Sequence, residues 1–591
     1  NGFAGGCTGD WTLLVISDLT VPANVAFGNS TNGHRVTIRP APGAEPVIRL
    51  TAPTVGTIPG HLVIGAVSLT TYDDLKKTDN FTINGCSDDG WSTRSLTFIN
   101  SNSAIPNSRV LMVVGNSDDF TMKNCKVTNQ ATNTGILTGT AVELHIRSTG
   151  EDYFIPDNAT FENCELTAAT ARYGTGIRQT RSGDALTVGN AMRGLTIRRN
   201  LIHARIYGVH LAQTAGAEIH DNTIRVTQTD AGYHIRGIYY TGFNSGAIWS
   251  LNIYNNTIDK LQSVNTGATG IDLGSLAVAA GLTPVSYNVY NNMICGFNFT
   301  NTTPAENVIY RGIYCDGYSS LGSDRDVFLN IHHNSVYLPH FDNLTYTDST
   351  AGRQAAFGIG CPVRSGNART IDLRNNNVRV EQKFAACIHP GISTYAARTL
   401  NYNNLSADTA NGALTARYNT AYDFATLADW QAALANRYDQ NSVSVNPLAP
   451  RPPLTGVWAA ADNLLYTSYP STRLHARPIA GITTDIKGAA RSAIHPFMGC
   501  EEHQASGPRI RLFSENLNFG RALILSEGGV AGSKTLVIQN VGTEDLIISG
   551  VTFISGSNEF VFDSVDTLIA PGATGNCRIL YTPETLGPVS A

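Results

Sequence analysis

The residues best suited to chemistry occupy one recurring position in this sequence. A signature of Gly, then Ile or Val, then a variable residue recurs along the chain, and Cys387-Ile388-His389 gives a seventh copy. The variable position holds Arg178, His210, Tyr239, Asp272, Tyr314, Gly360 and His389. A glycan hydrolase needs two or three carboxylates on neighbouring strands, and a lyase needs a base, commonly arginine or lysine, near a carboxylate-bound cation. This position supplies one carboxylate, Asp272.

A second carboxylate lies nearby in the pattern. Asp316 is two residues after Tyr314 and one repeat beyond Asp272, with Arg236 or Arg311 as the base. These two aspartates and two arginines are the catalytic candidates if the chain is an enzyme, either a polysaccharide lyase or a glycoside hydrolase. Alternatively, they are solvated residues of an exposed sheet, and Arg311 pairs with Asp316. The ordered motifs of polygalacturonase-type hydrolases are missing from the sequence, which favours the non-catalytic interpretation over an enzyme, and no catalytic residue is assigned.

Other polar clusters predict no metal or cofactor site. His332 and His333 would suit a metal pair or two polar residues of a turn, and we favour the turn. The acidic segments Asp118–Asp119 and Ser323–Asp326 could bind calcium, but neither has the spacing of a known calcium loop. The ten cysteines lack zinc-ligand spacing. We expect no cofactor, and calcium is the one ion that the acidic segments would suit.

The elements that position these residues form an eight-residue repeat, which reads apolar, polar, apolar, two polar residues, Asn or Cys, any residue, apolar. Its copies are Phe120–Val127, Ala159–Leu166, Leu195–Ile202, Ala217–Ile224, Leu251–Ile258, Tyr287–Ile294, Leu329–Val336 and Ile371–Val378. Alternating apolar residues predict a strand with one buried face. The glycine signature that follows predicts a second strand, so we expect two strands in each repeat.

One corner of the repeat predicts how successive copies stack. Asparagine fills it at Asn200, Asn222, Asn256, Asn292, Asn334 and Asn376, at intervals of 22 to 42 residues. Asparagine tolerates left-handed backbone and bonds neighbouring backbone groups, so these residues are expected to form a structural ladder. Without helices between the strands, the strands must pair in parallel, as a right-handed parallel β-helix. Cys125 and Cys164 occupy equivalent slots, and we expect stacked buried thiols, with a disulfide as the alternative.

The chain divides into three predicted parts, and the fold class is all-β. Residues 1–425 are expected to form the β-helix with its N-terminal cap. Residues 426–506 are expected to form a C-terminal cap and linker, with a short amphipathic helix within Tyr422–Arg437. Residues 507–591 predict a small immunoglobulin-like β-sandwich that stops before its last strand. Its strands are expected at Leu517–Phe519, Lys534–Asn540, Asp545–Ile548, Glu559–Phe562 and Cys577–Tyr581.

Composition excludes several kinds of partner. The net charge is −5, 15% of the residues are charged, and the sequence contains no basic stripe, so no nucleic acid is expected as a partner. No apolar run reaches the roughly 18 residues of a membrane span. The first residues, Asn1–Cys7, are unlike a signal peptide, so we expect a processed chain or a fragment.

Three sets of segments resemble a known group of proteins. The opening at Asn80–Asn100, the closing module and the final module are similar to large surface proteins of the Bacteroidetes, Chlorobi and Ignavibacteria type, many of which use type IX secretion. The closing module is Trp430, Asp439–Pro447, Asp485–Arg491 and Gly499–Glu502. The final module, Leu517–Gly520, Val537–Thr543, Ile569–Gly572 and Tyr581–Pro583, resembles the ASPM/SPD-2/Hydin-like (choice-of-anchor D) immunoglobulin-like domain.

This resemblance implies a secreted protein, located extracellularly or at the cell surface. It favours a non-catalytic structural or adhesive role, with copies of itself, other surface proteins or glycans as partners. The absent final strand predicts that a neighbouring copy completes the sandwich and links subunits into a filament or layer, unless the natural chain continues. The alternatives are a polysaccharide lyase or glycoside hydrolase, and a glycan-binding module.

Overall fold

The computed structural model describes most of the chain. The described residues are 7–23, 25–28, 30–51, 60–65, 78–87, 93–102, 108–115, 117–132, 139–149, 152–170, 173–182, 191–212, 214–230, 232–241, 250–274, 285–301, 305–315, 327–346, 355–361, 369–390, 397–418, 422–433, 437–447, 472–502, 508, 510–512, 517, 519, 524, 531–540, 544–553, 556–570 and 573–585.

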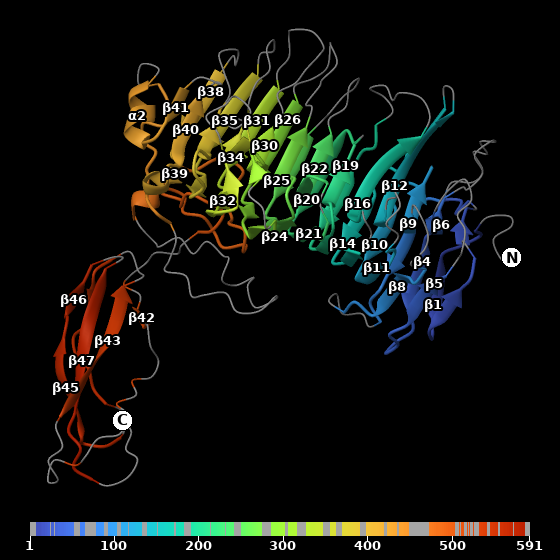
Figure 1. Cartoon of the computed structure of the whole chain (residues 1–591). Coiled ribbons are helices and arrows are strands. Elements are labelled where there is room, and N and C mark those ends of the chain that lie inside the picture. Colours follow the sequence, from blue (N-terminus) through green and yellow to red (C-terminus); the bar gives the residue numbers. More distant parts are fainter. Residues whose placement is uncertain are drawn as a thin grey trace.

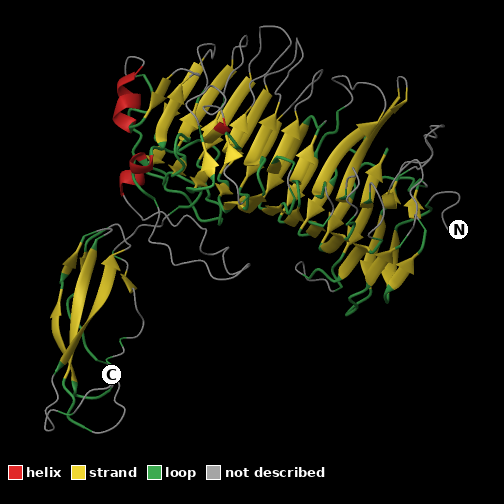
Figure 2. Ribbon diagram, in the orientation of Figure 1, coloured by secondary structure: helices red, strands yellow, loops and turns green. Residues whose placement is uncertain are grey.

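Three long sheets, named A, B and C, wind around one core as a parallel β-helix (Figure 1). Each coil contributes one strand to sheet A, then one to sheet B, then one to sheet C, and these strands pair in parallel with their equivalents in the next coil; β13 and β41 instead pair antiparallel at sheet C. Strands therefore dominate the described part of the ribbon (Figure 2). The predicted fold class is confirmed.

The strands follow the same order in all three sheets. Sheet A contains β1 (Trp11–Val15), β4 (Val36–Pro40), β7 (Phe81–Asn84), β10 (Thr121–Lys123), β14 (Thr160–Glu162), β17 (Leu195–Arg198), β20 (Gly216–His220), β23 (Ser250–Tyr254), β26 (Val285–Tyr290), β31 (Val327–His332), β35 (Arg369–Arg374) and β38 (Ala397–Asn401). Sheet B contains β2 (Leu19–Val21), β5 (Val47–Leu50), β8 (Leu96–Asn100), β11 (Cys125–Asn129), β15 (Glu165–Ala168), β18 (Leu201–Ala204), β21 (Thr223–Thr227), β24 (Thr257–Ser263), β27 (Met293–Ile294), β28 (Phe297–Phe299), β32 (Ser335–Leu338), β36 (Asn377–Val380) and β39 (Asn404–Ala407). Sheet C contains β3 (Val25–Phe27), β6 (Gly60–Ile64), β9 (Arg109–Val114), β12 (Thr140–Thr149), β13 (Asp152–Phe154), β16 (Thr175–Ser182), β19 (Tyr207–Leu211), β22 (Ile235–Thr241), β25 (Gly267–Gly274), β30 (Ile309–Cys315), β34 (Ala356–Gly360), β37 (Ala386–His389), β40 (Leu414–Tyr418) and β41 (Tyr422–Phe424). A separate pair, β29 (Ala305–Glu306) and β33 (Leu344–Thr345), lies outside these sheets.

The coil has three strands rather than the two predicted per repeat, because the eight-residue repeat crosses a bend. In the copy at Leu195–Ile202, β17 ends at Arg198 and β18 begins at Leu201. Arg199 has a φ of 57°, and its equivalents in other coils also adopt left-handed backbone. This residue turns the chain from sheet A to sheet B, while the ladder asparagine follows it.

The inner faces of the sheets form continuous columns of aliphatic side chains. On sheet C the column consists of Ile177, Val209, Ile238, Ile271, Ile313, Ile359 and Ile388, all fully buried. Burying each such side chain contributes about 2 kcal/mol relative to exposure. This repeated burial stabilises each coil against its two neighbours, as expected for a solenoid.

A short helix packs near the last coils of the β-helix. Helix α2 (Leu427–Ala432) is capped by Thr426, whose side chain accepts a hydrogen bond from the Asp429 backbone N–H. The indole of Trp430 is buried and donates to Asp439 Oδ2 at 2.8 Å. Asp439 also accepts from Asn403 at 3.0 Å, so it terminates the asparagine ladder.

The segment 472–502 packs along the bend between sheets A and B. Arg491 donates to Asn291 Oδ1 at 2.7 Å and forms a buried ion pair with Glu502 at 3.1 Å. The backbone N–H of Cys500 donates to Ser335 Oγ at 3.0 Å. These contacts join a late segment to middle coils. It contains the 3₁₀ turn η5 (Thr472–Leu474); another, η3, spans Thr409–Asn411.

The final part is a small β domain. Its larger sheet has the order β42 (Ile510–Leu512), β43 (Gly532–Asn540), β47 (Thr574–Tyr581) and β45 (Phe560–Val565), and β44 (Leu546–Ile547) pairs with β46 (Leu568–Ile569). The strand predicted at Leu517–Phe519 is wrong, because neither described end of it, Leu517 or Phe519, is in a strand. Ile510–Leu512 pairs with β43 instead, while the Phe519 ring packs 5.5 Å from that of Phe560. The predicted site of strand donation, beyond residue 585, lies outside the described residues.

The cysteines and the lengths of the helices bear on two predictions made from the sequence. All ten cysteines are buried and free, so the ladder interpretation of Cys125 and Cys164 is favoured over the disulfide. Burial is the main cause that raises the pKa of the Cys125 thiol. No helix in the described part of the chain is long and apolar enough to cross a membrane.

Candidate functional site

The variable positions of the glycine signature form one row on the outer face of sheet C. The strand registers align Arg178, His210, Tyr239, Asp272, Tyr314, Gly360 and His389 in consecutive coils, and the preceding coil contributes Glu143. A second row, three residues earlier on each strand, contains Arg109, Tyr207, Arg236, Arg311 and Phe357. These two rows are the candidate site.

Asp272 is engaged by Arg236. The two side chains form an ion pair, and Asp272 is only 3% exposed. Burial favours a lower pKa for Arg236, but the attraction and hydrogen bond of Asp272 raise it overall. The carboxylate and the proposed base therefore neutralise each other, which disfavours both as acid–base catalysts.

Of the other half of the predicted catalytic group, Arg311 lies in the second row of the site. Asp316 lies outside the described residues. The Arg311 guanidinium lies 4.2 Å from the Tyr314 ring centroid and 5.0 Å from that of Phe357. Arg311 therefore makes cation–π contacts, and its predicted pairing with Asp316 stays a prediction.

Glu143 is a buried carboxylate that sequence reasoning missed. It accepts hydrogen bonds from Arg109 at 2.6 Å and from the Thr180 hydroxyl at 2.7 Å, and its side chain is fully buried. Burial alone would raise the pKa of Glu143, but hydrogen bonding with His145 and the charges of Arg109 and Arg178 lower it to about 2. Its strand lacks the Gly–Ile signature, so only its register with Arg178 on β16 could have revealed it.

Stability should depend on the ionised form of Glu143. Its pKa is below the ordinary 4.5, so its contribution is complete above about pH 4.5 and is lost as pH falls toward 2. The difference corresponds to about 3 kcal/mol. We expect the melting temperature of the natural chain to fall more steeply between pH 5 and 2 than that of Glu143→Gln, measured by circular dichroism. Parallel curves would contradict this assignment.

Arg178 and His210 are neighbours in the first row and make no hydrogen bond with another described side chain; the ring nitrogens of His389, further along the row, are likewise buried without a partner. The His210 ring stacks on Tyr239 with centroids 4.8 Å apart, and both its nitrogens are buried without a hydrogen-bond partner. Burial, followed by the charges of Arg178 and Arg236, lowers the pKa of His210 to about 3, so its ring is neutral at neutral pH. Arg178, half-buried, forms no hydrogen bond or ion pair with another described residue, and burial lowers its pKa.

The two adjacent histidines lie where the chain bends from sheet A to sheet B: His332 ends β31, and His333 forms the bend. His332 lies 3.1 Å from Asp372 on the outer face of sheet A. His333, with a φ of 53°, is buried; its Nδ1 lies 3.0 Å from the Phe497 carbonyl oxygen, and the Asn375 amide lies 2.9 Å from its Nε2. His333 is thus a turn residue. Across the described ranges, no group of three or more His, Cys, Asp or Glu side chains could hold a metal.

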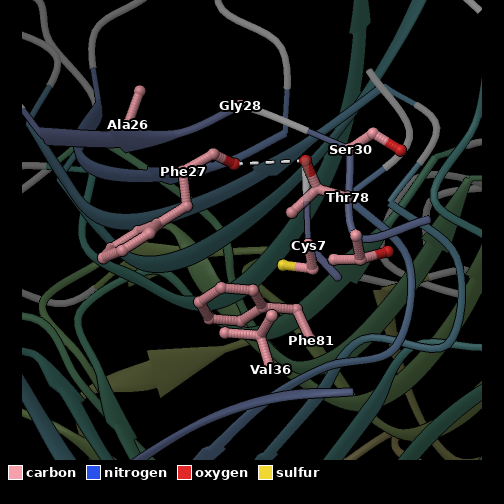
Figure 3. Close-up of a pocket in the computed structure, with 9 residues that line it drawn as sticks. Cys7, Ala26, Phe27, Gly28, Ser30, Val36, Thr78 and Phe81 are labelled. Carbon is pink, nitrogen blue, oxygen red and sulfur yellow. Dashed lines mark hydrogen bonds between the residues drawn. The ribbon is translucent and has the colours of Figure 1, made fainter. Parts of the chain in front are cut away.

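A cavity of about 180 Å³ lies among the first coils and is mostly apolar (Figure 3). The rings of Phe27 and Phe81 are 5.3 Å apart, and the Thr78 hydroxyl donates to the Phe27 carbonyl at 3.2 Å. Cys7 and Val36 complete much of the wall. These residues continue the core of the β-helix, so this cavity offers little for chemistry compared with sheet C.

Comparisons with known proteins do not extend this description: no family model, no curated protein and no solved structure matches the chain.

Proposed function

We propose that this chain is a secreted, non-catalytic scaffold of the cell surface or extracellular space, which assembles with copies of itself. The observation that carries the proposal is the continuity of the coil-to-coil ladders. Asn200, Asn222, Asn256, Asn292, Asn334, Asn376 and Asn403 are linked side chain to side chain at 2.9 to 3.1 Å through the buried bend. Such a ladder stiffens a long rod, because each coil holds its two neighbours in register.

The outer face of sheet A supports the same role. His220 stacks on Tyr254 at 4.6 Å, and Tyr254 stacks on Tyr290 at 4.8 Å, with nearly parallel rings. Asn252 accepts from Asn288 at 2.6 Å in the adjacent row. The stacked rings and the hydrogen bond between asparagine side chains join successive coils, so this face stabilises the rod.

The first coil supports assembly. Among the described strands, β1, β2 and β3 each pair with one neighbour, the strand of the next coil, and no described strand pairs with their opposite edges. Leu14 and Ile16 beside this edge are 53% and 75% exposed. An open edge with apolar side chains is a template for pairing with another chain. The resemblance to exported β-helix surface proteins of the Bacteroidetes, Chlorobi and Ignavibacteria type, and of the final domain to an immunoglobulin-like anchor module, agrees with this role.

Assembly can be tested with charges at the first coil. We expect the natural chain to form dimers, fibres or sheets in electron micrographs and sedimentation velocity, because association would bury the exposed side chains of Leu14 and Ile16. The double variant Leu14→Lys/Ile16→Lys should remain monomeric, since lysine on an edge opposes pairing.

The matched control is Ile494→Lys, since Ile494 is 67% exposed in the segment 472–502. This variant should assemble like the natural chain. A natural chain that is monomeric at all concentrations would contradict the proposed assembly. Cleavage of uronic-acid polymers by the natural chain, but not by the Asp272→Asn variant, would contradict the scaffold role and indicate a polysaccharide lyase or hydrolase.

A further inference from the structure

Positive charge exceeds negative charge on the outer face of sheet C between β9 and β25. Arg109 is paired with Glu143, and Arg236 is paired with Asp272. Arg178 lies between these pairs and has no carboxylate of its own among the described residues; its attraction to Glu143 is shared with Arg109. The guanidinium of Arg178 is half-buried and makes no hydrogen bond to a described carboxylate, so its N–H groups can donate to an external acceptor.

His210 gives an independent sign of a missing partner. It follows Arg178 in the next coil, directly in register. Its two ring nitrogens are shielded from water and bond no protein group, although a neutral imidazole carries one N–H donor. Tyr239 stacks on the His210 ring, so turning the ring nitrogens outward would break this stacking. A donor held in this way is satisfied by an acceptor that arrives with a ligand.

We propose that Arg178 and His210 bind an oxyanion of an acidic polysaccharide, the carboxylate of a uronic acid or a sulfate ester. The planar guanidinium of Arg178 would donate to two ligand oxygens, and the His210 N–H would donate to one. A polymer suits this face because the neighbouring row holds Arg311, four coils further on, about 19 Å along the β-helix at the usual spacing of strands. This site does not depend on whether the chain assembles.

Calorimetric titration of the full chain tests the proposal. The probes are polygalacturonate and chondroitin sulfate, with dextran as the neutral polymer and galacturonate and inorganic sulfate as small anions. We expect an acidic polymer to bind and dextran not to bind. Arg178→Gln should weaken binding about tenfold or more, because charge-assisted hydrogen bonds are lost. His210→Phe, which keeps the stacked ring but removes the nitrogens, should weaken it by a smaller factor.

The matched control is Lys126→Gln, which removes the same charge from an exposed residue of β11 on sheet B. It should bind as the natural chain does. Arg178→Gln should melt no lower than the natural chain, because it removes an unpaired charge; if it misfolds, Arg178→Lys, which keeps the charge without the planar fork, serves instead and should still weaken binding.

Three results would overturn the proposal. The first is that no acidic polymer binds the natural chain. The second is that Lys126→Gln and the Arg178 variant lose affinity equally, which would indicate attraction by net charge. The third is that galacturonate or sulfate alone binds as tightly as the polymers, which would assign the site to small anions.

Discussion

Replacing Asn292 with alanine should destabilise the coils around it by about 3 to 5 kcal/mol. The Asn292 amide donates to the Ile253 carbonyl at 2.8 Å and to Asn334 Oδ1 at 3.0 Å. Its own oxygen accepts from the backbone and side-chain N–H groups of Asn256 at 3.1 and 3.0 Å. Alanine would leave these groups buried without partners and would interrupt the ladder at its middle.

Local measurements suit this prediction, because a long solenoid need not unfold in one step. Hydrogen exchange should accelerate most in the coils adjoining β26. The control is Asn288→Ala on the same strand: Asn288 is half-buried on the outer face and bonds only the side chains of Asn252 and Asn330 among the described residues. Its exchange should change little, and equal effects of the two variants would show that the buried ladder has no special role.

Gly208→Ala should be nearly as disruptive, at about 3 kcal/mol. A Cβ at this position would lie 2.3 Å from Ile224 Cγ2 and 2.5 Å from the Gly237 carbonyl oxygen. The carbonyl belongs to the paired strand of the next coil, so the methyl group can be accommodated only by moving backbone. The glycine is required for close approach of two coils, and no positive φ is involved.

Limited proteolysis and thermal melting would measure this effect, with cleavage expected near β19 and β22. Gly9→Ala is the control, since a Cβ there would meet no atom within 4 Å. It should melt like the natural chain. A Gly208→Ala chain as stable and as protected as the control would mean that the coils can separate enough to admit a methyl group.

The sequence predicted the β-helix because each coil repeats the same local residue pattern. The glycine signature and the corner asparagine recur in order, and both turned out to occupy aligned positions. The number of strands per coil was missed, because the bend at Arg199 and its equivalents is made by one residue of varied type. The bend residue adopts a left-handed φ whether it is Arg199, Asp221, His333 or an asparagine, so no single residue type marks the bend in the sequence.

The candidate site divides in the same way. The sequence by itself determined which residues share the outward row of sheet C, since strand alternation and a fixed repeat decide which side chains share a face. Only the tertiary structure decided their partners: Arg236 with Asp272, Arg109 with Glu143, and none for Arg178 among the described residues. These contacts join different coils, whose separation in sequence varies with the intervening residues, so they depend on register and side-chain direction that no local pattern specifies.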